Sequence, residues 1–143
     1  MKTQFPMCNF CEFGTRCCKI IPPMIFEFER PKFEGKLITK EYRGYSILLL
    51  KKKGSNCIFL KQNKCLIYSS RPFNCKLFPF DITKKDNKFY WILWDFCYKP
   101  NDIEKNLKNF EKVIRKISKK ELDIYIYHLQ EVQNILKVEL LNY

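Results

Sequence analysis

The cysteines constrain this chain more than any other feature, because all eight of them lie before Pro100. They form two groups, Cys8-x2-Cys11-x5-Cys17-Cys18 and Cys57-x7-Cys65-x9-Cys75 followed by Cys97. Two thiolates separated by two residues can turn onto one ion at the ~2.3 Å zinc-sulfur distance. The clustering therefore predicts metal ligation by cysteine.

The compartment expected from the sequence supports ligation over disulfides. The N-terminus lacks the apolar core of a signal peptide, and no apolar stretch approaches the ~20 residues of a membrane span. A cytoplasmic protein without a membrane segment is expected, and thiols stay reduced in that compartment. An intracellular disulfide framework is the alternative.

The formal net charge of +12 predicts a basic surface. Lysine and arginine can bind phosphates, so a nucleic-acid-binding module is one interpretation. Only five of the 27 basic residues are arginine, however, and the chain has no alanine but many residues with codons rich in A and T. Genomic base composition is an equally direct cause of the charge.

The pattern predicts an α+β fold in one domain, residues 1–143, made of two parts. In the cysteine-rich part, 1–100, prolines punctuate short apolar runs, which favours short strands and loops. Strands are expected at Met24–Phe28, Tyr45–Leu50 and Phe89–Trp94, with Phe80–Thr83 paired to the last across a turn at 84–87. Pro72 is expected to begin a helix that carries Cys75.

The second part, 101–143, is predicted to be a pair of amphipathic helices packed on the first. Asn101 is the expected N-cap of one helix, with Glu104 three residues later and an apolar face from Ile103 to Ile117. Ser118 and Glu121 form a second capping box. The apolar stripe of that second helix is expected to run from Leu122 to Leu140.

The second cysteine group resembles a known family. The residues are Cys57-Ile-Phe-Leu, Cys65-Leu-Ile-Tyr68 and Arg71-Pro72-Phe-Asn-Cys75-Lys-Leu-Phe78-Pro79-Phe80. They are similar to the motif of the YkgJ-like CxxCxxxCC cysteine-cluster proteins, which are described as a zinc- or iron-chelating domain. The resemblance runs from about Cys8 to Cys97 and implies chelation by the cysteines, although five residues instead of three separate Cys11 from Cys17.

The candidate metal ligands are all eight cysteines: Cys8, Cys11, Cys17, Cys18, Cys57, Cys65, Cys75 and Cys97. Adjacent cysteines usually point in different directions, so Cys17 and Cys18 either serve two sites or only one of them ligates. Cys97 is the other cysteine that could be dispensable. The only histidine, His128, falls on the second predicted helix and is expected to be a packing or surface residue.

The cofactor expected is an iron-sulfur cluster, with 4Fe-4S favoured, or zinc. Structural zinc commonly uses two short knuckles, and this chain has a single Cys-x2-Cys, whereas iron-sulfur ligation tolerates irregular thiolate spacing. Arg71 could hydrogen-bond the sulfurs or neutralise the anionic centre, or it could make an ordinary ion pair. Aromatic residues crowd the cysteines in sequence and serve as core, as a shield against water, or as both.

Three functions remain open. The first is a metal-binding module with a structural or redox role. The second is a part of a protein lysine methylation system, since flagellin lysine methylases contain a similar cluster, but no glycine-rich loop for a nucleotide-like cofactor is present. The third is a metal-stabilised nucleic-acid-binding module. No nucleophile-base pair is evident, which argues against an independent enzyme. The protein partner is unknown.

Overall fold

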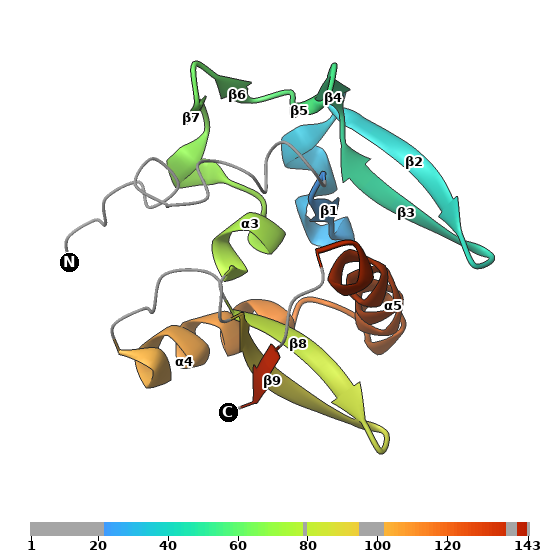
Figure 1. Ribbon diagram of the computed structural model, residues 1–143, viewed down its shortest axis with the longest axis vertical. Coiled ribbons are helices and arrows are strands. Elements are labelled where there is room, and N and C mark those ends of the chain that lie inside the picture. Colours follow the sequence, from blue (N-terminus) through green and yellow to red (C-terminus); the bar gives the residue numbers. More distant parts are fainter. Residues whose placement is uncertain (1–21, 79, 95–101, 137–139, 143) are drawn as a thin grey trace.

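The computed structural model describes residues 22–78, 80–94, 102–136 and 140–142. Short antiparallel strand pairs come first along the chain, and two helices follow (Figure 1). This confirms the predicted mixed α+β class.

The first sheet has the order β1-β3-β2, with β1 at Met24–Ile25, β2 at Leu37–Tyr42 and β3 at Tyr45–Leu50. β3 has the predicted bounds. The strand predicted at Met24–Phe28 is wrong beyond Ile25, because the chain turns into a 3-10 helix, η1, at Glu27–Phe33. The Glu29 carboxylate accepts a hydrogen bond from the Phe26 backbone N–H at 3.3 Å, which stabilises this turn.

Two small hairpins follow the first sheet and carry two of the cysteines (Figure 1). β4 (Lys52–Lys53) pairs with β5 (Asn56–Cys57), and β6 (Leu60–Lys61) pairs with β7 (Lys64–Cys65). Gln62 and Asn63, between β6 and β7, both have positive φ, as a two-residue type I′ turn requires. A short 3-10 helix, η2 (Tyr68–Ser70), then leads to the one-turn helix α3 (Phe73–Leu77).

The second sheet has the order β10-β9-β8. β8 (Phe80–Lys85) and β9 (Lys88–Trp94) form the predicted hairpin, with a tighter turn at Asp86 and Asn87. The third strand, β10 (Leu140–Asn142), pairs with β9. The expectation that the apolar helical stripe reaches Leu140 is therefore wrong: the open edge of β9 takes these residues as a strand.

The two helices are α4 (Ile103–Ile114) and α5 (Lys119–Leu136). The N-cap of α4 is Asp102, whose carboxylate accepts from the Lys105 N–H at 3.1 Å, one residue later than predicted. An aspartate is a strong N-cap residue, so the cap could move by one position.

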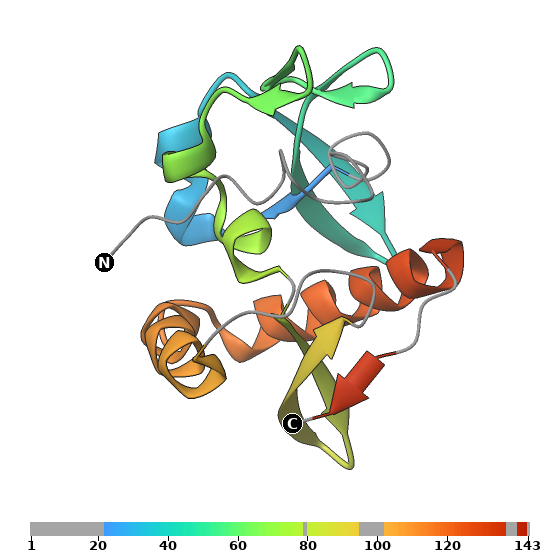
Figure 2. The ribbon, with the colours of Figure 1, turned by 60° about the vertical axis from the view of Figure 1, so that its left-hand side comes forward.

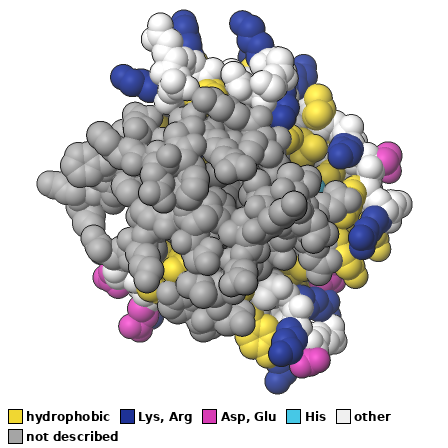
Figure 3. Space-filling model, viewed as in Figure 1, with side chains coloured by type: hydrophobic (Ala, Val, Ile, Leu, Met, Phe, Trp, Pro, Cys, Tyr) yellow, Lys and Arg dark blue, Asp and Glu magenta, His cyan; other side chains and the backbone are white. Residues whose placement is uncertain are grey.

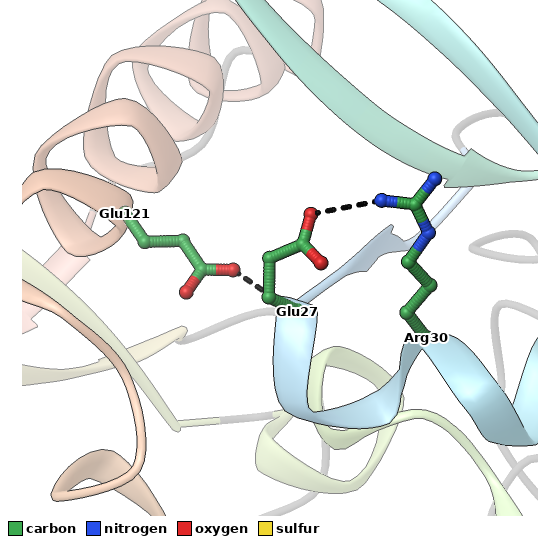
Figure 4. A network of polar contacts seen from close by, with 3 residues as sticks. All are labelled: Glu27, Arg30 and Glu121. Carbon is green, nitrogen blue, oxygen red and sulfur yellow. Dashed lines mark hydrogen bonds and ion pairs between the residues drawn. The ribbon is translucent and has the colours of Figure 1, made fainter.

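The N-cap of α5 is confirmed, since the Ser118 hydroxyl accepts from the Glu121 N–H at 3.1 Å. The Glu121 carboxylate reaches away from its own helix and accepts from the Glu27 backbone N–H at 2.7 Å (Figure 4). The Glu27 carboxylate in turn pairs with Arg30 at 3.5 Å. Glu121 thus connects the start of α5 to the start of η1.

α5 lies between the two sheets (Figure 2). Its buried residues join those of both sheets and of α3 in one hydrophobic cluster, which includes Met24, Leu49, Leu77, Leu93 and Tyr125. A second, smaller cluster lies under the two cysteine hairpins and consists of Ile25, Phe33, Leu50 and Cys57. None of the described helices is long and apolar enough to cross a membrane.

Candidate metal centre

Cys57 ends the β4-β5 hairpin, opposite Lys52. Its side chain is buried, with 8% of the residue exposed, and it belongs to the smaller hydrophobic cluster. The half-buried Phe59, Leu60 and Ile67 pack against that cluster. The Cys57 sulfur is thus held in apolar surroundings by elements on both sides of it.

Cys65 ends the next hairpin, opposite Leu60, and is half-buried. Burial raises the pKa of the Cys65 thiol, and the charge of Cys57 raises it further, whereas a backbone hydrogen bond at Ile67 and the charge of Arg71 lower it. Leu60, the partner of Cys65 in its hairpin, packs against the apolar cluster that contains Cys57. The two consecutive hairpins therefore place Cys57 and Cys65, eight positions apart in sequence, at the same apolar cluster.

Cys75 lies in α3, as predicted, and is half-buried. Pro72 precedes the helix, and its carbonyl accepts hydrogen bonds from the N–H groups of Cys75 at 2.9 Å and Lys76 at 3.0 Å. The fixed φ of proline favours this tight start. Cys57, Cys65 and Cys75 are all outside disulfides.

The other five candidate ligands lie outside the described residues: Cys8, Cys11, Cys17, Cys18 and Cys97. Within the described parts of the chain, no group of three or more Cys, His, Asp or Glu side chains is placed to hold a metal ion. A centre held by three or more cysteines would therefore need ligands from these five residues in addition to any supplied by Cys57, Cys65 or Cys75.

Arg71 lies between η2 and α3. Its Nε donates to the Tyr68 carbonyl oxygen at 2.7 Å, and its guanidinium stacks 3.8 Å from the centre of the Tyr68 ring. Stacking and a backbone hydrogen bond fix the orientation of this cation beside Cys65. Its charge also acts on Lys76, whose pKa is lowered first by loss of solvent and then by Lys32 and Arg71. Arg71 and Lys76 thus lie on the same short segment of the chain as Cys75.

The sequence did not reveal Glu29, a buried carboxylate that reaches α3. Phe73 is the first residue of α3, and its N–H donates to one of the Glu29 carboxylate oxygens at 2.6 Å. Burial raises the pKa of Glu29, and the hydrogen bonds from Phe73 and Phe26 oppose that rise. The segment 24–33 also contains Glu27, Arg30 and Lys32, so nothing in the local sequence distinguished Glu29 as the buried charge.

A polar network on the other side of α3 was also missed. Tyr125 of α5, which is 2% exposed, donates from its hydroxyl to the Asp81 carboxylate at 2.5 Å. The same hydroxyl accepts from the Asn74 side chain at 2.9 Å. The helical stripe correctly marked Tyr125 as buried, but nothing in the sequence identified its partners.

His128 lies on α5, as predicted, where its ring meets Tyr42 edge-on with centroids 6.1 Å apart. This contact places His128 against β2. Neither α5 nor β2 carries a candidate ligand. The expectation that it packs instead of ligating agrees with this position.

The comparison with known families gives the class of this protein. The chain belongs to the CxxCxxCC family, described as a "Putative zinc- or iron-chelating domain", which matches residues 7–98. The matched segment contains all eight cysteines, and α4 and α5 lie beyond it. No match to the chain was found among curated proteins or among solved structures.

Proposed function

We propose that the chain holds a metal centre through cysteine thiolates, and that the centre is an iron-sulfur cluster with a structural or redox role. Cys57, Cys65 and Cys75 supply ligands in this proposal, and the rest come from among Cys8, Cys11, Cys17, Cys18 and Cys97, of which Cys18 and Cys97 are dispensable. The observation that carries it is that Cys57 and Cys65, both outside disulfides, end two consecutive hairpins that pack on one apolar cluster.

The charges around this pair support an anionic centre. A four-thiolate zinc site or an oxidised 4Fe-4S cluster carries about -2. Burial raises the pKa of the Cys65 thiol, and the charge of Arg71 opposes that rise. Arg71 therefore favours the thiolate form of Cys65 and would likewise stabilise a bound anionic centre.

The surroundings of Cys57 favour iron-sulfur over zinc. A cluster's potential depends on burial and on hydrogen bonds to its sulfurs, and Cys57 lies among Phe33, Leu50 and Phe59. Irregular spacing of the thiolates points the same way. When bound, an iron-sulfur cluster supplies electron transfer, which zinc cannot. The protein residues hold it, exclude water and balance its charge.

Metal analysis of protein prepared without oxygen tests this proposal. We expect a brown protein with iron and acid-labile sulfide in similar amounts. Cys65→Ser and Cys75→Ser should lose the centre, because serine is a poor replacement for a soft thiolate. Cys18→Ser and Cys97→Ser are the matched controls and should retain most of it. Stoichiometric zinc with no cluster after anaerobic reconstitution would refute the iron-sulfur assignment, and full metal content in Cys65→Ser would refute the ligand set.

A nucleic-acid-binding module is the second candidate, favoured by one feature of the surface. No Asp or Glu occurs between Glu41 and Asp81, a stretch that contains eight Lys and Arg residues. The exposed Lys52, Lys53, Lys61 and Lys64 belong to the cysteine hairpins, and basic side chains stand out at that end of the molecule (Figure 3). Binding of a duplex whose affinity falls steeply with salt would support this candidate.

A cytoplasmic location and a single folding unit of residues 1–143 are part of the proposal. The cytoplasmic location rests on the expectation that clustered cysteines which act as metal ligands stay reduced in that compartment. The hydrophobic cluster shared by α3, α5 and both sheets supports a single folding unit. Fractionation of cells and a single cooperative unfolding transition would test them.

A further inference from the structure

The polar network around Tyr125 connects four elements of the fold. The Asn74 side chain of α3 accepts from the Met24 backbone N–H of β1 at 3.1 Å and donates to the Tyr125 hydroxyl of α5. That hydroxyl donates to Asp81 of β8. Asp81 is 3% exposed, and its carboxylate also accepts from the Ile82 N–H at 3.0 Å. These groups are paired within the protein interior, where a lost partner is costly.

The network acts on the helix that carries a candidate ligand. Asn74 directly precedes Cys75 in α3, a helix of only five residues. Such a short helix has little stability of its own, so its orientation depends on contacts from outside. Glu29 accepts from its first N–H, and the Tyr125 hydroxyl accepts from the Asn74 side chain.

We propose that Tyr125 is a positioning residue of the metal centre, which fixes Cys75 through Asn74 and couples occupation of the centre to the packing of α5. The inference rests on the proposed function, specifically on Cys75 as a ligand. It assigns a role in metal binding to a helix beyond residues 7–98, the segment shared with the family.

Coupling of this kind is reciprocal. If the packing of α5 favours the ligating position of Cys75, then a bound metal favours the packing of α5 by the same factor. The C-terminal helix would therefore respond to whether the centre is filled. A purely structural tyrosine would stabilise the metal-free and metal-loaded protein equally and would show no such response.

Cobalt(II) binding to the reduced full-length chain tests the proposal, because thiolate-to-cobalt absorption reports ligation directly. Tyr125→Phe keeps the ring and removes only the hydroxyl, and we expect about tenfold weaker cobalt binding, the effect of one lost hydrogen bond. Tyr127→Phe is the matched control on the same helix. Tyr127 is 41% exposed, so its variant should bind cobalt like the wild type.

The same substitution in a Cys75→Ser background separates positioning from general destabilisation. The remaining thiolates of Cys75→Ser should still bind cobalt, more weakly, even where the cluster is lost. Without the Cys75 ligand, Tyr125→Phe should change that residual cobalt affinity no further. Equal cobalt affinity in wild type and Tyr125→Phe would overturn the proposal, even if the thermal midpoint falls. A tenfold loss that persists in the Cys75→Ser background would overturn it as well. A wild-type chain that binds neither cobalt nor a reconstituted cluster would instead refute the proposed function itself.

Hydrogen exchange on the wild-type chain keeps the test decisive if Tyr125→Phe fails to fold. Metal loading should increase the protection of amides at 122–129, around Tyr125. Unchanged protection there, measured in a protein that demonstrably binds cobalt, would show that α5 and the centre are independent.

Discussion

The two ends of this molecule are built by different means. At one end, β8 and β9 pair over six residue positions, and Phe110 of α4 packs its ring against Phe73, Phe80 and Trp91 with centroids 5.7–6.3 Å apart. At the other end, β4-β5 and β6-β7 are ladders of two residue pairs each. Isolated two-stranded hairpins are marginal in water. The contrast suggests that apolar burial sustains the first end, whereas the second depends on its cysteines.

Metal removal should give the largest difference between the two ends. At free metal a thousand times its dissociation constant, binding stabilises the folded state by about 4 kcal/mol. A strong chelator should therefore speed amide exchange in residues 52–77 far more than in β8, β9 and α4. Hydrogen exchange with and without chelator checks this. Uniform loss of protection across both ends would show that they do not differ in the way proposed.

A core substitution should produce the opposite pattern. Leu93, on the central strand of the second sheet, is 1% exposed, and Leu93→Ala should reduce the free energy of unfolding by about 3 kcal/mol through the cavity it leaves. Metal content should not change, because β9 carries none of the three described cysteines. Denaturant unfolding and metal analysis of the same sample measure both effects. The exposed Leu66 provides a control, since Leu66→Ala removes a side chain that is 63% exposed.

Elements of the fold that depend on the local sequence could be predicted, whereas elements that depend on distant residues could not. Tyr45–Leu50 was found as a strand because a continuous apolar run fills the centre of a sheet. Ser118 was found as an N-cap because capping is local chemistry. β2 was missed, since four of its six residues are exposed and its run Leu-Ile-Thr-Lys-Glu-Tyr has no buried face to set a period of two. β10 was missed because its pairing depends on the free edge of a distant strand.

In the candidate site, too, the features set by the local sequence were predictable and those set by distant residues were not. Pro72 was sufficient to predict that Cys75 lies on a helix, whereas joint ligation by Cys57 and Cys65 stays a prediction. The residues that hold those elements were not predictable. Glu29 reaches α3 across 44 positions of sequence, and Asn74 meets Tyr125 across 51. Such pairs are created by packing, which no local pattern encodes.

Glu29→Gln should have the smallest effect and would test the connection from η1 to α3. The carboxylate accepts from two backbone N–H groups, Phe73 and Phe26, and an amide presents only one oxygen. One buried N–H would lose its acceptor, which costs about 1 to 2 kcal/mol. Glu41→Gln, at an exposed carboxylate, is the matched control and should leave the free energy of unfolding almost unchanged.

The difference in the free energy of unfolding between wild type and Glu29→Gln should depend on pH in a way that is specific to Glu29. Burial raises the pKa of Glu29 in the folded protein above its usual value of 4.5. A raised pKa contributes stability that is complete below the unfolded value and is lost as pH rises through the folded one. The stability advantage of wild type over Glu29→Gln should therefore be largest near pH 4 and should shrink toward neutral pH. Glu121 also has a raised pKa, but it titrates in both proteins and cancels in the difference. Chemical denaturation at several pH values measures this, and an advantage that grows with pH would mean that the two N–H groups hold Glu29 ionised instead.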